Sequence, residues 1–194
     1  MTFSNGLRSI LRQDPDIIAV GEIRDGETAE IAMRAAITGH LVLSTVHTSN
    51  AAAAIDRLLD IGVAPYLIAA AVRGIVSQRL VRRICPHCKQ EYTPTPEELD
   101  VLGLDGAEGH VFYRGKGCPM CFHTGYRGRI GVFEILILDR ALRRGIADGL
   151  DRDRLVELIN QSDFISLADN CRRLVLEGVT TIEEAARTIN SADL

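Results

Sequence analysis

The segment between Asp14 and Asp25 limits most strongly what this chain can fold into. A polar turn that contains a proline leads into an unbroken apolar run over residues 17–20, which ends at Gly21 and a cluster of charges. An unbroken run of this length is typical of a parallel strand that is buried on both faces. Because ligands of open α/β sheets bind at the carboxyl ends of the strands, we expect Glu22 to stand at a ligand-binding edge.

The residues that follow this run have the chemistry of nucleotide hydrolysis. Gly21 allows the backbone to approach a ligand closely, Glu22 supplies a carboxylate for a metal-bound water, and Arg24 supplies a cation for phosphate oxygens. The alternative is an ordinary buried strand that ends in solvated charges. This segment alone is compatible with both interpretations.

A second strand is expected after an intervening helix. Residues 26–38 carry apolar side chains at helical spacing and end at Gly39, and residues 40–47 form a run rich in β-branched side chains. The order strand, helix, strand predicts a parallel pair. If the two strands are neighbours, His47 and Glu22 reach the same edge of the sheet.

The composition indicates a globular protein with one substantial domain and an appendage. The chain has 194 residues, 46% of them hydrophobic, and a net charge of -4, which disfavours a general nucleic-acid surface. Local basic clusters at residues 79–83 and 127–129 are more typical of solvated faces or subunit contacts. No apolar run approaches the roughly 20 residues that cross a bilayer, and the first residues lack the pattern of a secretory signal. We therefore expect a cytoplasmic location without insertion into the membrane.

Two Cys-x-x-Cys pairs predict a structural metal site. Each tight turn can aim two thiolates at one point, and two such turns complete a closed tetrahedral zinc site. A redox dithiol is the alternative, but one pair would be enough for redox chemistry. Cys171 lies at helical spacing from apolar neighbours and is expected to be a core residue. The four expected zinc ligands are Cys85, Cys88, Cys118 and Cys121.

The remaining patterns place strands and helices around the cysteine pairs. Residues 75–84 fit either a helix end or a strand, whereas residues 126–136 predict a glycine-punctuated strand that returns to the main body. Four short helical patterns follow, over residues 139–149, 151–162, 166–177 and 180–190. Their expected N-caps include Asp151, Ser166 and Thr180. One buried seam is expected, made of Leu155, Leu158, Ile159, Leu167, Cys171, Leu174, Val175, Ile182 and Ala186.

The charged strand end resembles the Walker B segment of the secretion ATPases, which drive type II secretion and type IV pilus assembly. The resemblance lies in Asp14-Pro15-Asp16 followed by Gly21-Glu22-Ile23-Arg24-Asp25; this family has glycine where most P-loop proteins have the metal-binding aspartate. The second strand resembles the His box of the family, with Thr38-Gly39-His40 before it and Thr45-x-His47-Thr48 after it. Gln78-Arg79-Leu80, the cysteine pairs and the returning strand extend the resemblance over almost the whole chain.

This resemblance implies an α/β fold in three parts. Residues 1–84 would form a partial RecA-like parallel-sheet ATPase core, residues 85–125 a tetracysteine zinc subdomain, and residues 126–194 the returning strand and a C-terminal helical bundle. It also implies ATP with Mg²⁺ as cofactor beside structural Zn²⁺, a hexameric ring of subunits, and action on an inner-membrane platform protein with other secretion or pilus components. The protein would then lie at the periphery of the inner membrane through these partners.

The resemblance also assigns roles at the strand ends. Glu22 would position magnesium and the attacking water, and His47 would sense the γ-phosphate. The other positions implied to be associated with nucleotide or magnesium are Gly21, Arg24, Asp25, Thr45 and His40. His40 is expected at the far end of its strand, where a histidine satisfied by local hydrogen bonds is the favoured interpretation.

The phosphate loop of such ATPases has no counterpart in these residues. Nothing in the 194 residues matches Gly-x-x-x-x-Gly-Lys-Ser/Thr. We therefore expect the C-terminal part of a longer motor, which by itself hydrolyses ATP negligibly. Because pilus-retraction members lack the tetracysteine subdomain, retraction is the less expected activity. The alternative from another class is a non-catalytic zinc module that docks onto a partner; a nucleic-acid-binding zinc ribbon is weaker, since the chain is acidic and poor in aromatic residues.

Overall fold

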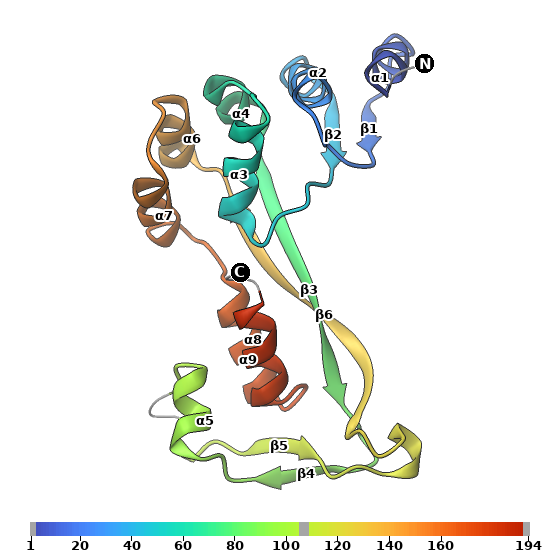
Figure 1. Ribbon diagram of the computed structural model, residues 1–194, viewed down its shortest axis with the longest axis vertical. Helices are drawn as coiled ribbons and strands as arrows, with labels where there is room; N and C mark the ends of the chain where they lie inside the picture. The colour runs from blue at the N-terminus through green and yellow to red at the C-terminus, as the bar shows by residue number, and fades with distance from the viewer. Residues whose placement is uncertain (1–2, 105–108, 192–194) are drawn as a thin grey trace. The chain divides into compact units, whose positions relative to one another are not determined.

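A computed structural model describes residues 3–104 and 109–191 (Figure 1). The chain divides into two compact units, each made of two stretches of sequence. The first unit comprises Met1–Ile75 and Ile135–Phe164, and the second comprises Val76–Glu134 and Ile165–Leu194. Among the described helices, none is both long and apolar enough to cross a membrane.

The first unit is built on two parallel strands. Helix α1 (Phe3–Leu11) precedes β1 (Ile17–Val20), and α2 (Gly26–Ile37) connects β1 to β2 (Leu41–Ser44). The strands pair in parallel, from Ile17 opposite Leu41 to Val20 opposite Ser44, and their arrows run the same way in Figure 1. The predicted strand, helix, strand unit is confirmed, and both strands end at one edge.

Capping residues explain where the helices of this unit begin and end. Asn50 accepts a hydrogen bond from the N–H of Ala53 and caps α3 (Ala51–Asp60). Gly39 has a φ of 115° and Gly62 a φ of 89°, a left-handed conformation that glycine adopts without strain at a helix end. The other helices of the unit are α4 (Pro65–Ala71), α6 (Arg140–Ala147) and α7 (Arg152–Asn160).

The second unit combines strands from both sides of the cysteine pairs with two late helices. The segment that fits either a helix end or a strand is a strand, β3 (Gly74–Ile84), and it pairs with β6 (Tyr126–Ile137). A second, antiparallel pair joins β4 (Lys89–Tyr92) and β5 (Phe112–Gly115). The remaining elements are α5 (Pro96–Val101), the 3-10 turn η1 (Pro119–Cys121), α8 (Leu167–Leu176) and α9 (Ile182–Asn190).

The four C-terminal helices do not share one buried seam, contrary to the expectation. Leu155 and Ile159 belong to the core of the first unit, whereas Leu167, Cys171 and the later apolar positions belong to the core of the second. Helical periodicity shows which face of a helix is apolar but not which core it joins.

The N-cap of the last helix also differs from the prediction. Thr181, not Thr180, caps α9 and accepts a hydrogen bond from the N–H of Glu184. The hydroxyl of Thr180 instead donates to the carbonyl of Arg82, at 2.8 Å. Adjacent threonines offer the same chemistry, so tertiary contacts decide which of them caps.

A buried ion pair attaches α9 to β3. Glu184 is 1% exposed and accepts hydrogen bonds from the backbone N–H of Arg82, at 3.0 Å, and from its guanidinium, at 2.7 and 2.9 Å. Burial by itself would raise the pKa of the Glu184 carboxyl, but the bonds from Arg82 lower that pKa below its ordinary value. Arg82, which belongs to the basic cluster at residues 79–83, is therefore paired with the buried carboxylate of Glu184.

Replacing Glu184 with glutamine should lower the free energy of unfolding by roughly 2–3 kcal/mol at neutral pH, because Arg82 loses its charged partner while staying partly buried. The folded pKa lies below the ordinary 4.5, so the stabilisation is present above that pH and is lost as the pH falls through the folded pKa. Urea unfolding at several pH values, followed by circular dichroism, measures this difference.

The exposed neighbour Glu183 provides the matched control, Glu183→Gln, which should unfold like the wild type. Equal stability of wild type and Glu184→Gln at neutral pH would contradict the importance of this ion pair.

Candidate functional site

The ends of β1 and β2 are joined by two hydrogen bonds. The N–H of Ile23 donates to the carbonyl of Thr45, at 2.9 Å, and the hydroxyl of Thr45 donates to the carbonyl of Gly21, at 2.7 Å. These bonds continue the strand pairing beyond its last residues. They hold the segment after β1 against the segment after β2, which brings the predicted site residues together.

Glu22 lies between a cation and a histidine at this edge. One carboxylate oxygen forms an ion pair with Arg24, and the other lies 3.1 Å from Nε2 of His47. The hydrogen bond from Arg24 lowers the pKa of Glu22, and the contact with His47 acts in the same direction. The side chain of Glu22 is 29% exposed and that of His47 is 87% exposed, so the pair faces solvent with an ionised carboxylate.

Asp25 acts as the N-cap of α2. Its Oδ1 accepts a hydrogen bond from the N–H of Thr28 at 2.9 Å, and its Oδ2 accepts one from the hydroxyl of Thr28 at 3.0 Å. The bond from the Thr28 amide lowers the pKa of Asp25. Both oxygens are thus used to fix the start of the helix, and the helix N-terminus beside them is a favourable environment for an anion.

An open pocket of about 570 Å³ lies at the strand ends. Its lining consists of Gly21, Glu22, Arg24, Asp25, Thr28, Thr45 and His47. Six of these residues were expected from the sequence or the resemblance; Thr28 was missed, because a threonine in the first turn of a helix is not by itself a signal of a binding site. The pocket combines carboxylates, a guanidinium, an imidazole and a helix N-terminus, which is a suitable set for a phosphate group with a divalent cation.

His40 lies away from this pocket, at the beginning of β2. Its Nδ1 is 3.0 Å from the carbonyl of Ala35 and 3.4 Å from the hydroxyl of Thr38. His40 therefore has local hydrogen bonds at the far end of the strand, as one interpretation expected, and it does not line the pocket with the other residues that the resemblance associates with nucleotide. Its contacts are those of a residue that fixes the turn between α2 and β2.

The second candidate site is a cluster of four cysteines. Cys85 follows β3, Cys88 precedes β4, and Cys118 and Cys121 bracket η1; their sulfur atoms all lie within 4.8 Å of one another. The measured Sγ–Sγ distances are 3.9 Å for Cys85–Cys118, 3.9 Å for Cys88–Cys121 and 3.7 Å for Cys118–Cys121.

These distances fit a tetrahedral metal and not a disulfide. Zinc–sulfur bonds of about 2.3 Å at tetrahedral angles separate the sulfur atoms by about 3.8 Å, whereas a disulfide bond is about 2.05 Å long. All four cysteines are free thiols in the structure. The donor set is therefore suited to a structural Zn²⁺ with no open coordination position.

Backbone amides point at two of the sulfur atoms. Cys121 Sγ accepts from the N–H groups of Cys118, at 3.2 Å, and Gly125, at 3.3 Å, and Cys88 Sγ accepts from Gly117, at 3.3 Å. Burial opposes ionisation of Cys121, but these amides lower its pKa to about 6. Burial raises the pKa of Cys88 to about 12, so metal binding would have to displace protons from part of the cluster.

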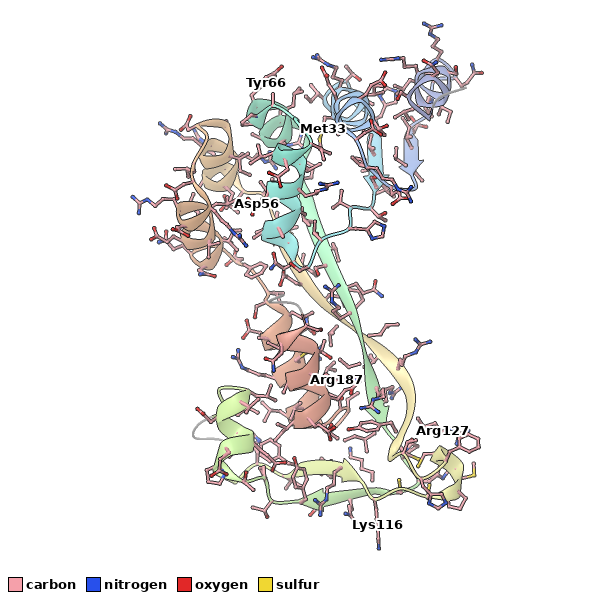
Figure 2. The ribbon with its side chains drawn as sticks, in the orientation of Figure 1. Met33, Asp56, Tyr66, Lys116, Arg127 and Arg187 are labelled. Carbon is pink, nitrogen blue, oxygen red and sulfur yellow. The ribbon has the colours of Figure 1, made fainter. Side chains whose placement is uncertain are left out.

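A close backbone contact joins the segments that precede and follow the second cysteine turn. A Cβ atom on Gly115 would lie 2.1 Å from the carbonyl oxygen of Gly125, so only glycine permits this approach. The nearby histidines are not part of the metal-competent cluster of the described residues. His87 instead contacts the guanidinium of Arg127, at 3.2 Å, and Figure 2 shows Arg127 beside the turn that carries the sulfur atoms.

Comparisons with known proteins show the family of this chain. A family model described as "Type II/IV secretion system protein" matches residues 1–187. The chain is 50% identical, over 97% of its length, to the type IV pilus assembly ATPase PilB of Thermus thermophilus. It is 48% identical, over 96% of its length, to the type II secretion system protein E of Pseudomonas aeruginosa. The chain spans 22% and 37% of the length of these two relatives.

Two solved structures share the fold of this chain. The crystal structure of the pilus retraction motor PilT with bound ADP matches 96% of this chain and 43% of its own, with a TM-score of 0.65 and 28% identity. The ATPase DotB of Legionella pneumophila, at 23% identity over 98% of this chain and 41% of its own, supports the fold with a TM-score of 0.66. The α/β ATPase fold is thus confirmed, and the chain belongs to the type II/IV secretion system protein family.

Proposed function

We propose that this chain contributes the Walker B segment, the His box and a zinc subdomain to an ATP-hydrolysing motor of type II secretion or type IV pilus assembly. The observation that carries the proposal is the position of Glu22 between Arg24 and His47 at the ends of two paired parallel strands. Relatives named as a pilus assembly ATPase and as a secretion system protein support it. The proposal covers both type II secretion motors and type IV pilus assembly motors.

In this proposal the pocket binds the phosphate end of ATP with its Mg²⁺. Glu22, whose pKa Arg24 lowers, would orient the attacking water, and His47 would respond to the γ-phosphate. Gly21 and Thr45 supply the fixed backbone on which these side chains stand. Asp25 contributes through the N-terminus of α2, whose amide groups favour a phosphate nearby.

The 194 residues contain no Gly-x-x-x-x-Gly-Lys-Ser/Thr pattern. We therefore expect the phosphate-binding loop to be supplied by residues outside these 194. Glu22, Arg24 and His47 alone do not provide the cradle of amides and the lysine that phosphoryl transfer uses. We therefore propose that the 194 residues by themselves turn over ATP negligibly. In the complete motor we expect a hexameric ring that acts on an inner-membrane platform protein and is held at the membrane through such partners.

A non-catalytic zinc module that docks onto a partner is the second candidate. The cysteine cluster of the second unit favours it, since a closed Cys₄ site is structural. It gives no reason, however, for the arrangement of Glu22, Arg24 and His47.

Grafting this chain onto the P-loop half of the Pseudomonas aeruginosa relative should give an active ATPase. In that chimera Glu22→Gln should lower kcat by roughly 100-fold or more, because the carboxylate that orients water is lost, whereas the exposed Glu91→Gln should keep the parent rate. Steady-state phosphate release measures both variants. The proposal fails if Glu22→Gln leaves the rate unchanged, or if the ungrafted chain hydrolyses ATP robustly in a Glu22-dependent way.

The purified chain should contain one zinc ion, held by the four cysteines. Cys121→Ser should weaken zinc binding by roughly 100-fold or more, since removing a ligand costs more than removing a hydrogen bond to one. Affinity should also fall in acid, as protons compete for the thiolates. Elemental analysis and competition with a chromophoric chelator measure this, with Cys171→Ala as the control that retains zinc; full zinc in Cys121→Ser would refute the Cys₄ site.

A further inference from the structure

The last helix begins on a residue that is bonded to the neighbourhood of the cysteine cluster. Thr181, the N-cap of α9, has its Oγ1 2.8 Å from the hydroxyl oxygen of Tyr126. Tyr126 follows Gly125 in the chain, and the N–H of Gly125 donates to Cys121 Sγ at 3.3 Å. The carbonyl of Gly125 accepts from the N–H of Cys85 at 2.9 Å. A short run of hydrogen bonds and peptide bonds therefore connects the cap of α9 to one cysteine of each pair.

Arg82 makes a second connection between α9 and the cysteine turns. Its guanidinium carbon lies 4.0 Å from the centroid of the Tyr126 ring, a favourable cation–π distance, and the same guanidinium bonds to the buried Glu184 of α9. The N–H of Ile84, the residue directly before the first cysteine, donates to the carbonyl of Val179 at 2.9 Å. The first turn of α9 is thus attached both before the first cysteine pair and after the second.

These attachments make α9 sensitive to the positions of Tyr126 and Arg82. Thr181 and Glu184 are buried, and a buried polar group that loses its partner costs free energy. Hydrogen bonds also weaken steeply as their distance and angle depart from the optimum. A shift of Tyr126 and Arg82 would therefore leave unpaired groups beneath the first turn of α9 and favour its detachment.

A metal ion in the cysteine cluster would fix Tyr126. The sulfur atoms of the contacting pairs lie 3.7–3.9 Å apart, a distance at which uncharged thiols attract one another weakly and thiolates repel. Zn²⁺ bonded to the four sulfur atoms would supply the attraction, and the binding free energy of a structural zinc is also folding free energy. The hydrogen bond from Gly125 to Cys121 passes this constraint to the next residue, Tyr126.

We propose that zinc binding and the docking of α9 are coupled, with Tyr126 and Arg82 as the positioning residues that transmit the coupling. All of these parts lie in the second unit. Loss of zinc would release Gly125 and Tyr126 and would thereby detach the first turn of α9. Because coupling is reciprocal, docking of α9 raises the affinity for zinc by the same factor by which zinc favours docking. The inference rests on the proposed zinc site and is independent of the proposed ATPase activity.

The apolar core offers a competing route, which the choice of variant separates. Ile182 of α9 shares a core with Phe112, so a general loosening of the second unit would also disturb this helix. Tyr126→Phe keeps the ring and its contact with Arg82 and removes only the hydroxyl that meets Thr181. This variant therefore tests the polar route while the core stays intact.

Hydrogen–deuterium exchange of the chain, loaded with Zn²⁺ or stripped by a chelator, measures the coupling. The amides of residues 182–190 should exchange roughly ten-fold faster or more without zinc, because local opening of α9 becomes easier. The amides of α2 and α4 belong to the first unit and should exchange alike in both states, which makes them the internal control. Equal exchange of α9 with and without zinc would overturn the proposal.

The zinc affinity of Tyr126→Phe is the reciprocal measurement. Competition with a chromophoric chelator should show zinc binding weakened roughly five-fold, the factor that one net hydrogen bond contributes. Tyr113→Phe is the matched control, since it also removes only a hydroxyl in the second unit and its ring keeps the contact with Lys89, whose Nζ lies 4.0 Å from the ring centroid. This control should bind zinc like the wild type.

The possible outcomes distinguish the coupling from the site on which it rests. A chain that binds no zinc would refute the Cys₄ site and the coupling together, whereas bound zinc without any effect on α9 would refute the coupling alone. Wild-type zinc affinity in Tyr126→Phe, or an equal loss in Tyr113→Phe, would refute the route through Tyr126. Circular dichroism verifies the fold of each variant, and the exchange experiment, which uses the wild type, decides the proposal even if a variant misfolds.

Discussion

The candidate nucleotide site depends on the pairing of two short parallel strands. The register from Ile17–Leu41 to Val20–Ser44 ends both strands at one edge, and Thr45 extends the pairing through the carbonyl of Gly21. A shift of one residue in this register would turn Ile18 and Val20 out of the core, and would also separate Glu22 from His47. The packing of an apolar strand and the position of a carboxylate are therefore set by the same hydrogen bonds.

The second unit contains two stabilising polar features, the cysteine cluster and the buried ion pair of Arg82 with Glu184. The segments on either side of the second cysteine turn approach closely because Gly115 and Gly125 have no side chains in the way, and backbone amides directed at Cys121 lower the pKa of its thiol. The buried Glu184 joins β3 to α9 in a unit of modest apolar core. The second of the turns that gather the sulfur atoms leaves Phe122 exposed.

The sequence predicts those features that depend on local pattern and on the rules of chain connection. The parallel strand pair, the common edge of Glu22 and His47 and the cysteine cluster are of this kind. The pairing of Arg82 with Glu184, which are 102 positions apart, has no local signature, and helical periodicity did not reveal that α6–α7 and α8–α9 join different cores. Asp25 and Thr28 differ in this respect, since the resemblance placed Asp25 near the nucleotide, whereas no local pattern assigned Thr28 to the pocket.

The most direct test of the account is a structure of this chain, joined to the P-loop half of a relative, with Mg²⁺ and a non-hydrolysable ATP analogue. The account predicts a γ-phosphate within hydrogen-bond distance of His47, and a water on the magnesium or in line for attack within reach of the Glu22 carboxylate. A bound nucleotide with Glu22 and His47 still paired to each other and remote from its phosphates would contradict it.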